Sequence, residues 1–227
     1  MSETLKLNTR FCLPREELED RIKANFHQNF GGYDQIVPAR DVKEAEHIAL
    51  FQNDVLNALL SRIPLRRDGD LVFPYEHAKF DMYSVEPKAL LIGQTFVLEE
   101  KLLSIMFDMG KLFSSHVTKG ISKMPPVQIY GRDGQENKVM AFYIPPLVEK
   151  HGEEAILLDG LHRSTICSSA GTTICSIHIS GVAEPLPFDP ISWGEVRLFK
   201  EKPSIDRCYV NLKRVYFRDL SYVGIDG

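Results

Sequence analysis

The feature that most constrains the fold is a short polar segment between a buried-strand pattern and a helix pattern. Residues 155–158 are apolar and predict a short strand, and the chain beyond residue 165 predicts a helix that ends at residue 170. The connecting segment reads Asp159, Gly160, Leu161, His162, Arg163, Ser164 and Thr165. Glycine has no side chain to restrict its backbone, so Gly160 predicts a sharp turn in which the main chain can approach a ligand closely.

Anion binding is the chemistry that this segment favours. The N–H groups that open a helix have no partner within it, and they lie at the positive end of the helix dipole. Arg163 adds a planar guanidinium that suits phosphate oxygens, His162 adds a second donor, and Ser164 and Thr165 offer hydroxyls. Asp159 is expected to orient His162 or Arg163, to hold a metal ion, or to accept a proton from a substrate hydroxyl.

A purely structural interpretation of the same residues stays open. Asp159 would then cap the helix, Gly160 would only be a turn residue, and His162 and Arg163 would be solvated. Two basic residues in the first turn have the wrong sign for the helix dipole, at a cost of about 0.3–1 kcal/mol unless an anion compensates. Because such local mismatches tend to occur at functional positions, the binding interpretation is favoured.

The wider segment resembles a known family. The run 156–163, the short helix after it, Gly171 and the strand expected over 174–179 are similar to the nucleotide-binding core of the ParB/sulfiredoxin superfamily. The resemblance covers residues 88–185 and implies an α+β fold, a mixed sheet with packed helices. Its Asp-Gly-x-His-Arg form is most similar to the branch with the ADP-dependent free serine kinases and the ParB-like nuclease domains.

In that family the turn holds nucleotide phosphates, which implies that ATP or ADP binds here with Mg²⁺. We therefore expect the phosphates on Gly160, Leu161, His162, Arg163, Ser164 and Thr165, a metal ion on Asp159, and catalytic roles for Asp159 and His162. The resemblance adds a catalytic base at the start of the preceding helix, either Glu99 or Glu100. Glutamates in a first helical turn are common dipole partners, so a structural role for that pair is equally open.

Cysteine chemistry is not expected to carry the function. Leu161 stands where the sulfiredoxins have their catalytic cysteine, so reduction of a sulfinic acid is not expected. Cys167 lies inside the expected helix, where a buried thiol is usually a small core residue. The four cysteines form no C-x-x-C pair, which favours a reducing, intracellular setting.

The rest of the chain is expected to flank this core. Helices are predicted over residues 13–28, 41–61 and 98–113. Strands are predicted over residues 71–73, 80–85, 89–92, 127–130 and 138–144. The helix over 98–113 is expected to bury Leu102, Leu103, Met106 and Phe107. We therefore expect a helical N-terminal extension over residues 1–70, the nucleotide-binding core over 71–190, and a basic, aromatic tail over 191–227 that packs on the core.

The charge distribution distinguishes the tail from the body. The chain has 27 Lys and Arg against 31 Asp and Glu, and this net charge of −4 argues against wholesale coating of nucleic acid. Residues 195–218 nevertheless hold seven cations against three acids, interleaved with aromatic residues. Such a region can bind a single nucleic-acid strand, although a solvated charged face is the favoured interpretation. Without a secretory leader or a membrane-length apolar run, we expect a cytoplasmic protein with no membrane partner.

Together these patterns predict a phosphotransferase that uses ATP or ADP, with Mg²⁺, and acts on a small hydroxyl-bearing molecule. Two alternatives stay open. One is a ParB-like nucleic-acid-binding or nuclease module in which residues 195–218 contact DNA or RNA, and the other is a non-catalytic nucleotide-binding protein. Salt dependence separates the first alternative, because nucleic-acid binding falls steeply with salt. The sequence leaves the oligomeric state open.

Overall fold

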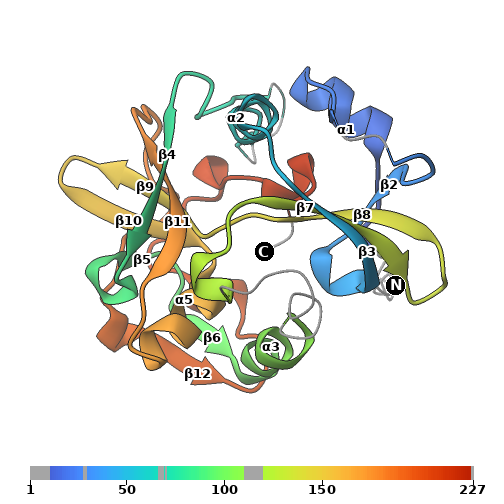
Figure 1. Ribbon diagram of the computed structural model, residues 1–227. Helices are drawn as coiled ribbons and strands as arrows, with labels where there is room; N and C mark the ends of the chain where they lie inside the picture. Colours follow the sequence, from blue (N-terminus) through green and yellow to red (C-terminus); the bar gives the residue numbers. More distant parts are fainter. Residues whose placement is uncertain (1–10, 28–29, 66–68, 70, 110–119, 226–227) are drawn as a thin grey trace, which may run out of the picture.

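The computed structural model describes residues 11–27, 30–65, 69, 71–109 and 120–225, which form an α+β fold on two mixed sheets. The first sheet has the order β1 (Leu13–Pro14), β2 (Gln35–Ile36), β8 (Lys138–Tyr143), β7 (Val127–Asp133) and β3 (Val42–Leu50). The second has the order β4 (Lys79–Val85), β11 (Ile174–Ser180), β9 (Leu147–His151), β10 (Glu154–Asp159) and β5 (Leu91–Ile92). A separate pair joins β6 (Phe96–Leu98) to β12 (Arg197–Phe199) in parallel. Figure 1 shows the two larger sheets side by side.

The helices are short. They are α1 (Arg15–Ile22), α2 (Asn53–Ser61), α3 (Glu99–Ser104), α5 (Leu161–Ser169) and α6 (Ile205–Cys208). A π-helical segment, Ile105–Met109, continues α3. Single 3₁₀ turns occupy Ala39–Asp41, Pro87–Ala89, Ile121–Lys123, Trp193–Glu195, Arg214–Tyr216 and Leu220–Val223. Within the described part of the chain, no helix is both long and apolar enough to cross a bilayer.

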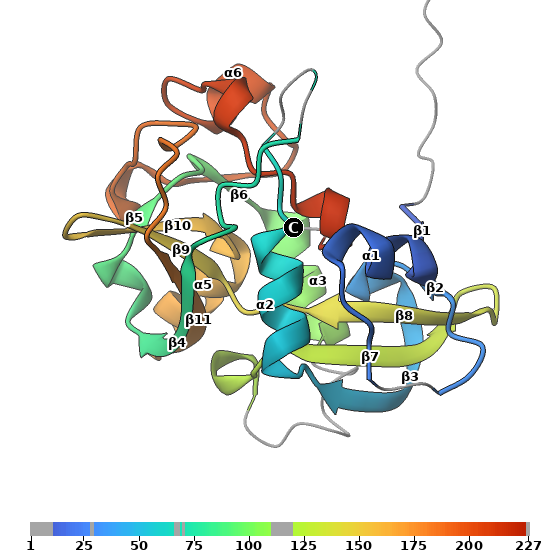
Figure 2. The same ribbon diagram turned by 90° about the horizontal axis from the view of Figure 1, so that it is seen from above.

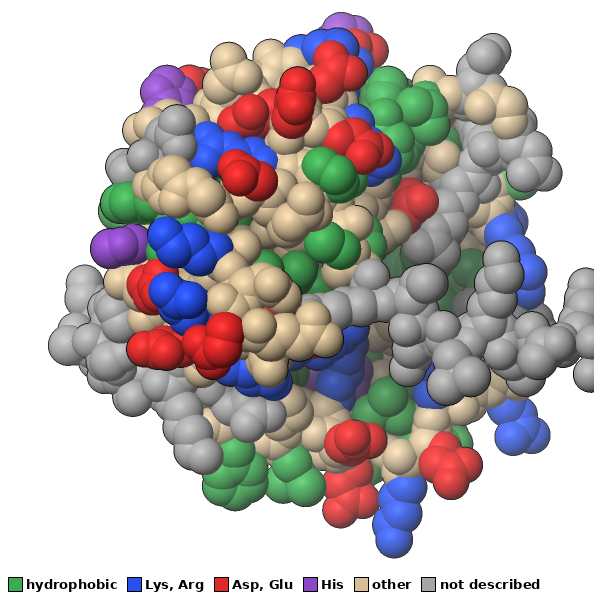
Figure 3. All heavy atoms as spheres, turned by 90° about the vertical axis from the view of Figure 1, so that its right-hand side faces the viewer, with side chains coloured by type: hydrophobic (Ala, Val, Ile, Leu, Met, Phe, Trp, Pro, Cys, Tyr) green, Lys and Arg blue, Asp and Glu red, His purple; other side chains and the backbone are tan. Residues whose placement is uncertain are grey.

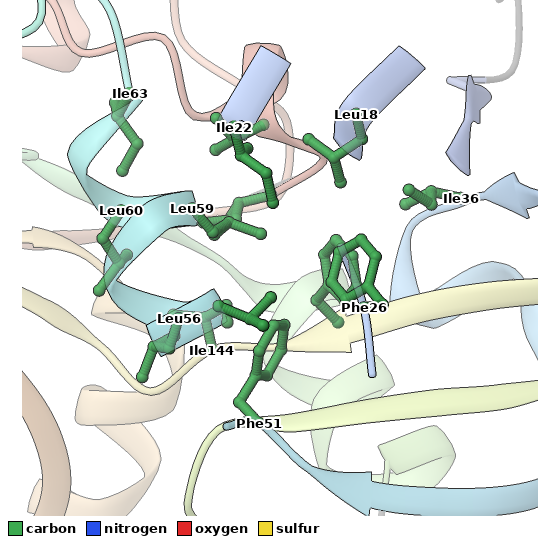
Figure 4. Close-up of a cluster of buried hydrophobic side chains, with 14 of the residues drawn as sticks. Leu18, Ile22, Phe26, Ile36, Phe51, Leu56, Leu59, Leu60, Ile63 and Ile144 are labelled. Atoms are coloured by element: carbon green, nitrogen blue, oxygen red, sulfur yellow. The ribbon is translucent and has the colours of Figure 1, made fainter. Parts of the chain in front are cut away.

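The main hydrophobic core lies between the two sheets, and α2 occupies the space between them (Figure 2). Leu59 and Leu60 of α2 are fully buried there. Figure 4 shows Leu18 and Ile22 of α1 in the same cluster. Each such side chain contributes about 1.5–3 kcal/mol on burial, so this cluster joins the two sheets into one body.

A second cluster covers the opposite face of the second sheet and positions α5. Val148 of β9 and Leu157 of β10 are buried in it. Leu161, the first residue of α5, packs into the same cluster and is only 3% exposed. The start of α5 is therefore anchored directly to the strand that precedes it.

The helix expected over residues 41–61 is wrong in its first half. Residues 42–50 form β3, which pairs antiparallel with β7 from Val42 opposite Asp133 to Leu50 opposite Val127. The register shifts twice along this pair, so the alternation of side chains that marks a strand is broken. Ala45 and Ile48 thereby acquire a helix-like spacing, and pairing with β7 overrides local helix propensity. Only α2 retains the expected helix.

The helix expected over residues 98–113 is also shorter than predicted, and its apolar face is not buried. It ends as α3 at Ser104 and continues as the π-helical segment to Met109, while residues 110–113 lie outside the described residues. Leu102 is partly buried, but Leu103, Met106 and Phe107 are 47%, 58% and 63% exposed. Helical spacing identifies a common face but does not identify what, if anything, covers it.

Several other strands and helices form close to the positions that the sequence predicts. The hairpin β7–β8, the strands β4, β10 and β11, and the helix α5 form where they were predicted. The first helix is shorter than expected, because Lys23 adopts a left-handed conformation directly after Ile22. No strand forms at residues 71–73, where the carbonyl of Val72 instead accepts a hydrogen bond from Leu65.

The N-terminal segment is not an all-helical extension. β2 pairs with β8, and β3 pairs with β7. One sheet thus combines strands from both sides of the boundary that was expected at residue 70. β-Pairing between distant segments has no local sequence signal, which explains why the pattern of residues 1–70 did not reveal it.

The C-terminal tail is held by a buried ion pair. Glu149 of β9 is fully buried, and Arg218 binds it through two hydrogen bonds of 2.8 and 2.9 Å. Tyr75 donates to the same carboxylate, and His151 lies 2.7 Å from it. Burial would raise the pKa of Glu149, but the contacts with His151, Arg218 and Tyr75 outweigh burial and hold the pKa below its usual value.

We expect Arg218→Ala to lower the free energy of unfolding by about 3–5 kcal/mol, because it leaves the Glu149 carboxylate buried without a cation. Arg214→Ala is the matched control, since Arg214 is an exposed cation of the same tail and should cost less than about 0.5 kcal/mol. Urea denaturation followed by circular dichroism measures both. Equal losses in the two variants would contradict the role given to the ion pair.

Candidate functional site

The candidate site is built on the turn between β10 and α5. Gly160 connects them with φ +91°, a conformation that side chains rarely adopt. A Cβ on Gly160 would lie 2.7 Å from both Cβ and Cγ of Pro146. The sharp turn predicted from the sequence is confirmed, and glycine is required there both by backbone angle and by contact with Pro146.

The N-terminus of α5 carries no side-chain cap. Asp159, the residue that a structural interpretation would make the cap, does not bond to the backbone of the first turn. The first N–H groups of a helix have no intrahelical acceptor, and the earliest intrahelical bond here runs from Ser164 to Gly160. The main chain therefore offers donors and the positive end of the helix dipole at this point.

The guanidinium of Arg163 binds other groups of the protein. Its Nη2 atom lies 3.0 Å from Oδ2 of Asp159, and its Nη1 atom donates to the carbonyl of Ile144. The guanidinium also lies 5.2 Å from the centre of the Tyr143 ring. The Arg163 side chain is only 12% exposed, so this charge is largely buried beside the start of α5.

His162 joins the turn to α3. Its Nε2 atom accepts a hydrogen bond of 2.9 Å from the backbone N–H of Leu98, the residue directly before α3. Burial, together with the charge of Lys101, lowers the pKa of His162 from 6.5 to about 4. The ring is therefore neutral near pH 7, with its proton on Nδ1, and only Nδ1 remains as a donor toward a ligand.

Three other residues of the turn do not present donors to solvent. Leu161 and Ser164 are buried, and the Ser164 hydroxyl has no hydrogen-bond partner among the described residues. Thr165 donates back to the carbonyl of Leu161 at 2.8 Å. The hydroxyls expected to complete a phosphate cradle thus face the protein, and the backbone N–H groups remain as the principal donors.

Glu99 and Glu100 open α3, one and two residues beyond Leu98, and α3 packs against α5. Both are exposed, and both line an open groove of about 710 Å³ together with Leu103, Ser104, Phe107 and Lys200. The hydrogen bond between His162 and Leu98 joins the start of α5 to the start of α3. The groove itself is lined by α3, the π-helical segment and Lys200, and Glu99 and Glu100 lie on this exposed side of α3.

Sequence reasoning missed three contributors to this arrangement. Pro146 supports Gly160, Leu98 binds His162, and Lys200 lines the groove. The Pro145-Pro146 pair was a visible signal of a fixed backbone between β8 and β9. The other two contacts join residues distant in the sequence and carry no local signal.

The basic tail uses one of its cations and several of its aromatic rings within the protein, while its other cations are exposed: Arg197, Lys200, Lys202, Arg207, Lys213 and Arg214. Arg218 is buried against Glu149. Tyr209 stacks on Phe188 with 5.3 Å between ring centres, and Phe217 packs edge-on against Tyr209. These aromatic rings therefore pack against one another within the protein. Elsewhere, Figure 3 shows acidic and basic side chains interspersed over the first-sheet side of the molecule.

Two further observations concern metals and relatives. Within the residues that the structure describes, no three His, Cys, Asp or Glu side chains are grouped to hold a metal ion. Asp159 accordingly belongs to no such group among these residues. Comparison of the chain with family models, with curated proteins and with solved structures gave no match.

We expect Gly160→Ala to destabilise the protein more than Gly171→Ala. Gly171 also has a positive φ, +63°, but a Cβ there meets nothing within 4 Å. The difference should reach about 1–3 kcal/mol, since only the first variant adds a clash to backbone strain. Chemical denaturation of both variants measures it, and equal losses would show that Pro146 does not restrict the turn.

We also expect the stability of the protein to fall as the pH decreases from 6.5 toward 4, in part because of His162. Between these pH values the His162 ring binds a proton in the unfolded state but stays neutral in the folded state, because folding lowers its pKa. A fall in pH therefore favours unfolding. His162→Gln should flatten this part of the profile, whereas His77→Gln, at an exposed position, should leave the slope unchanged. Denaturation at a series of pH values tests this, and identical slopes for all three proteins would refute it.

Proposed function

We propose that this chain is a nucleotide-dependent phosphotransferase of the ParB/sulfiredoxin-like type, acting on a small hydroxyl-bearing molecule. One observation supports the proposal: the start of α5 has no side-chain cap, and His162 ties it to Leu98, the residue directly before the helix that carries Glu99 and Glu100. Phosphates need donors and positive potential, and an acceptor hydroxyl needs a base nearby. We assign the first requirement to the start of α5 and the second to Glu99 or Glu100.

The phosphates of ATP or ADP would lie at the start of α5. The backbone N–H groups of residues 161–163 would donate to the terminal phosphates, with the Arg163 guanidinium as a charged partner. Nδ1 of the neutral His162 ring would supply one more donor. Gly160 supplies the positive φ that turns the chain from β10 into α5, and Pro146 fills the space beside its Cα.

Asp159 suits a nucleotide-bound Mg²⁺ better than an independent metal site. Mg²⁺ is commonly held by one or two carboxylates together with substrate phosphates and water. Asp159 supplies one carboxylate, of which Oδ2 faces Arg163. When bound there, the metal ion would neutralise charge on the phosphates.

The acceptor would lie in the groove beside α3. Its hydroxyl oxygen attacks the terminal phosphorus, the bond from that phosphorus to the bridging oxygen breaks, and the hydroxyl proton passes to Glu99 or Glu100. The shortened nucleotide, ADP from ATP or AMP from ADP, leaves with the electron pair of the broken bond. Catalysis of this kind rests mainly on positioning and charge neutralisation.

We expect the protein to bind ATP or ADP in the presence of Mg²⁺, and Arg163→Ala to weaken that binding by about 10- to 100-fold, as for the loss of a charge-assisted hydrogen bond. Arg214→Ala, which removes an exposed cation of the tail, is the matched control and should bind as the wild type does. Isothermal titration calorimetry at fixed ionic strength measures all three proteins. A single-stranded oligonucleotide titrated in parallel tests the nucleic-acid alternative.

Wild-type protein that binds neither ATP nor ADP would overturn the proposal, and so would unchanged affinity in a folded Arg163→Ala variant. Tight oligonucleotide binding that weakens steeply with salt would favour the ParB-like nucleic-acid module. Nucleotide binding without transfer to any hydroxyl compound would identify a non-catalytic nucleotide-binding protein.

A further inference from the structure

The second sheet ends in a long edge strand that the fold does not cover. β4 pairs along all seven of its residues with β11 and is the last strand of its sheet (Figure 1). No backbone hydrogen bond joins β4 to any described residue outside β11. Its outward N–H and C=O groups are therefore available to another strand.

Side-chain exposure shows that β4 is open on both faces. Met82 is 51% exposed on the face that packs toward the main core, and Tyr83 is 47% exposed on the opposite face. Asp81 and Ser84 are exposed as well. Natural edge strands are usually shortened, bulged, covered or charged. β4 carries Lys79 and Asp81, but it is long and uncovered, and its pairing with β11 is regular throughout.

The sequence of β4 is compatible with antiparallel pairing to itself. A two-fold axis through Met82 keeps all seven residues paired and sets Met82 opposite Met82 of the second copy. The same register sets Asp81 opposite Tyr83 of the second copy, where a phenol can donate to a carboxylate, and Lys79 opposite Val85. No residue then faces a like charge directly, and both partners present the same complementary strand.

We propose that β4 is a homodimerisation edge, through which two copies of this chain join their second sheets into one continuous ten-stranded sheet. Side-chain complementarity, not charge pairing, argues for a second copy. The self-paired register forms the contact between Asp81 and Tyr83 twice, once on each side of the axis, and Met82 and its counterpart share an apolar contact at the axis. The edge lies on a different sheet strand from the candidate nucleotide site, so the two proposals stand independently.

Sedimentation velocity over a concentration series tests the assembly, with Met82→Lys as the disrupting variant. Two ammonium groups would then oppose each other at the axis and weaken the dimer by at least about tenfold. Leu71→Lys makes the same charge change at a position that is 49% exposed and outside β4, and should leave the dimer intact. Circular dichroism checks that both variants are folded.

Cysteine cross-linking tests the register and does not depend on the lysine variant. In a Cys12→Ser background, which removes an exposed thiol, Met82→Cys places two thiols at the axis. Opposed residues in an antiparallel pair have Cα atoms about 4.5–5.5 Å apart, within the range of a disulfide. Mild oxidation should give a covalent dimer for Met82→Cys and not for Leu71→Cys.

A wild-type protein that is monomeric up to about 100 μM, which corresponds to a binding free energy weaker than about −5.5 kcal/mol, overturns the proposal. A Met82→Lys variant that is folded and still dimeric overturns it too, as does a dimer in which Met82→Cys fails to cross-link. Loss of the dimer in Met82→Lys together with cross-linking of Met82→Cys supports it.

Discussion

The buried carboxylate of Glu149 is the interaction on which the second sheet and the C-terminal tail depend. An unpaired charge in a protein interior costs several kcal/mol, so the fold must bring a cation to this point. Arg218 does so with its planar fork, while Tyr75 and His151 bind the same carboxylate. Segments that lie 69 and 74 residues from Glu149 are thereby held at one position. A single charge in the middle of β9 thus specifies where the end of the chain must pack.

Pro146 connects that buried centre to the candidate site. It immediately precedes β9, and its ring occupies the space that a Cβ on Gly160 would need. β9 is paired on one side with β10 and on the other with β11, so Pro146 has little freedom to withdraw. The first turn of α5 therefore rests on a rigid support. Donors held in this way need no rearrangement when charge arrives, which is the physical basis of electrostatic preorganisation.

The sequence analysis succeeded where the determinants were local. A strand, a glycine and a helix in succession were sufficient to place the turn at Gly160, because each depends on its immediate neighbours. β3 was missed because two bulges disguise its alternation, and its stability comes from β7 more than 70 residues away in the chain. The engagement of His162 with Leu98 has no sequence signal at all, since 64 residues separate them. The position of the turn was predictable from the sequence, but the residues that orient its side chains were not.

Charge balance at the turn bears on which anion it would accept. Arg163 now neutralises Asp159, and the guanidinium is also held by the carbonyl of Ile144. A free phosphate that drew on Arg163 would leave the Asp159 carboxylate without its cation and facing a second anion, an unfavourable arrangement in a partly buried site. A nucleotide that arrives with its own divalent cation would supply both signs together. The phosphates would share Arg163 and the helix N–H groups, and the cation would replace Arg163 beside Asp159. Under the proposed function, the ion pair would thus favour a metal–nucleotide complex over an unaccompanied anion.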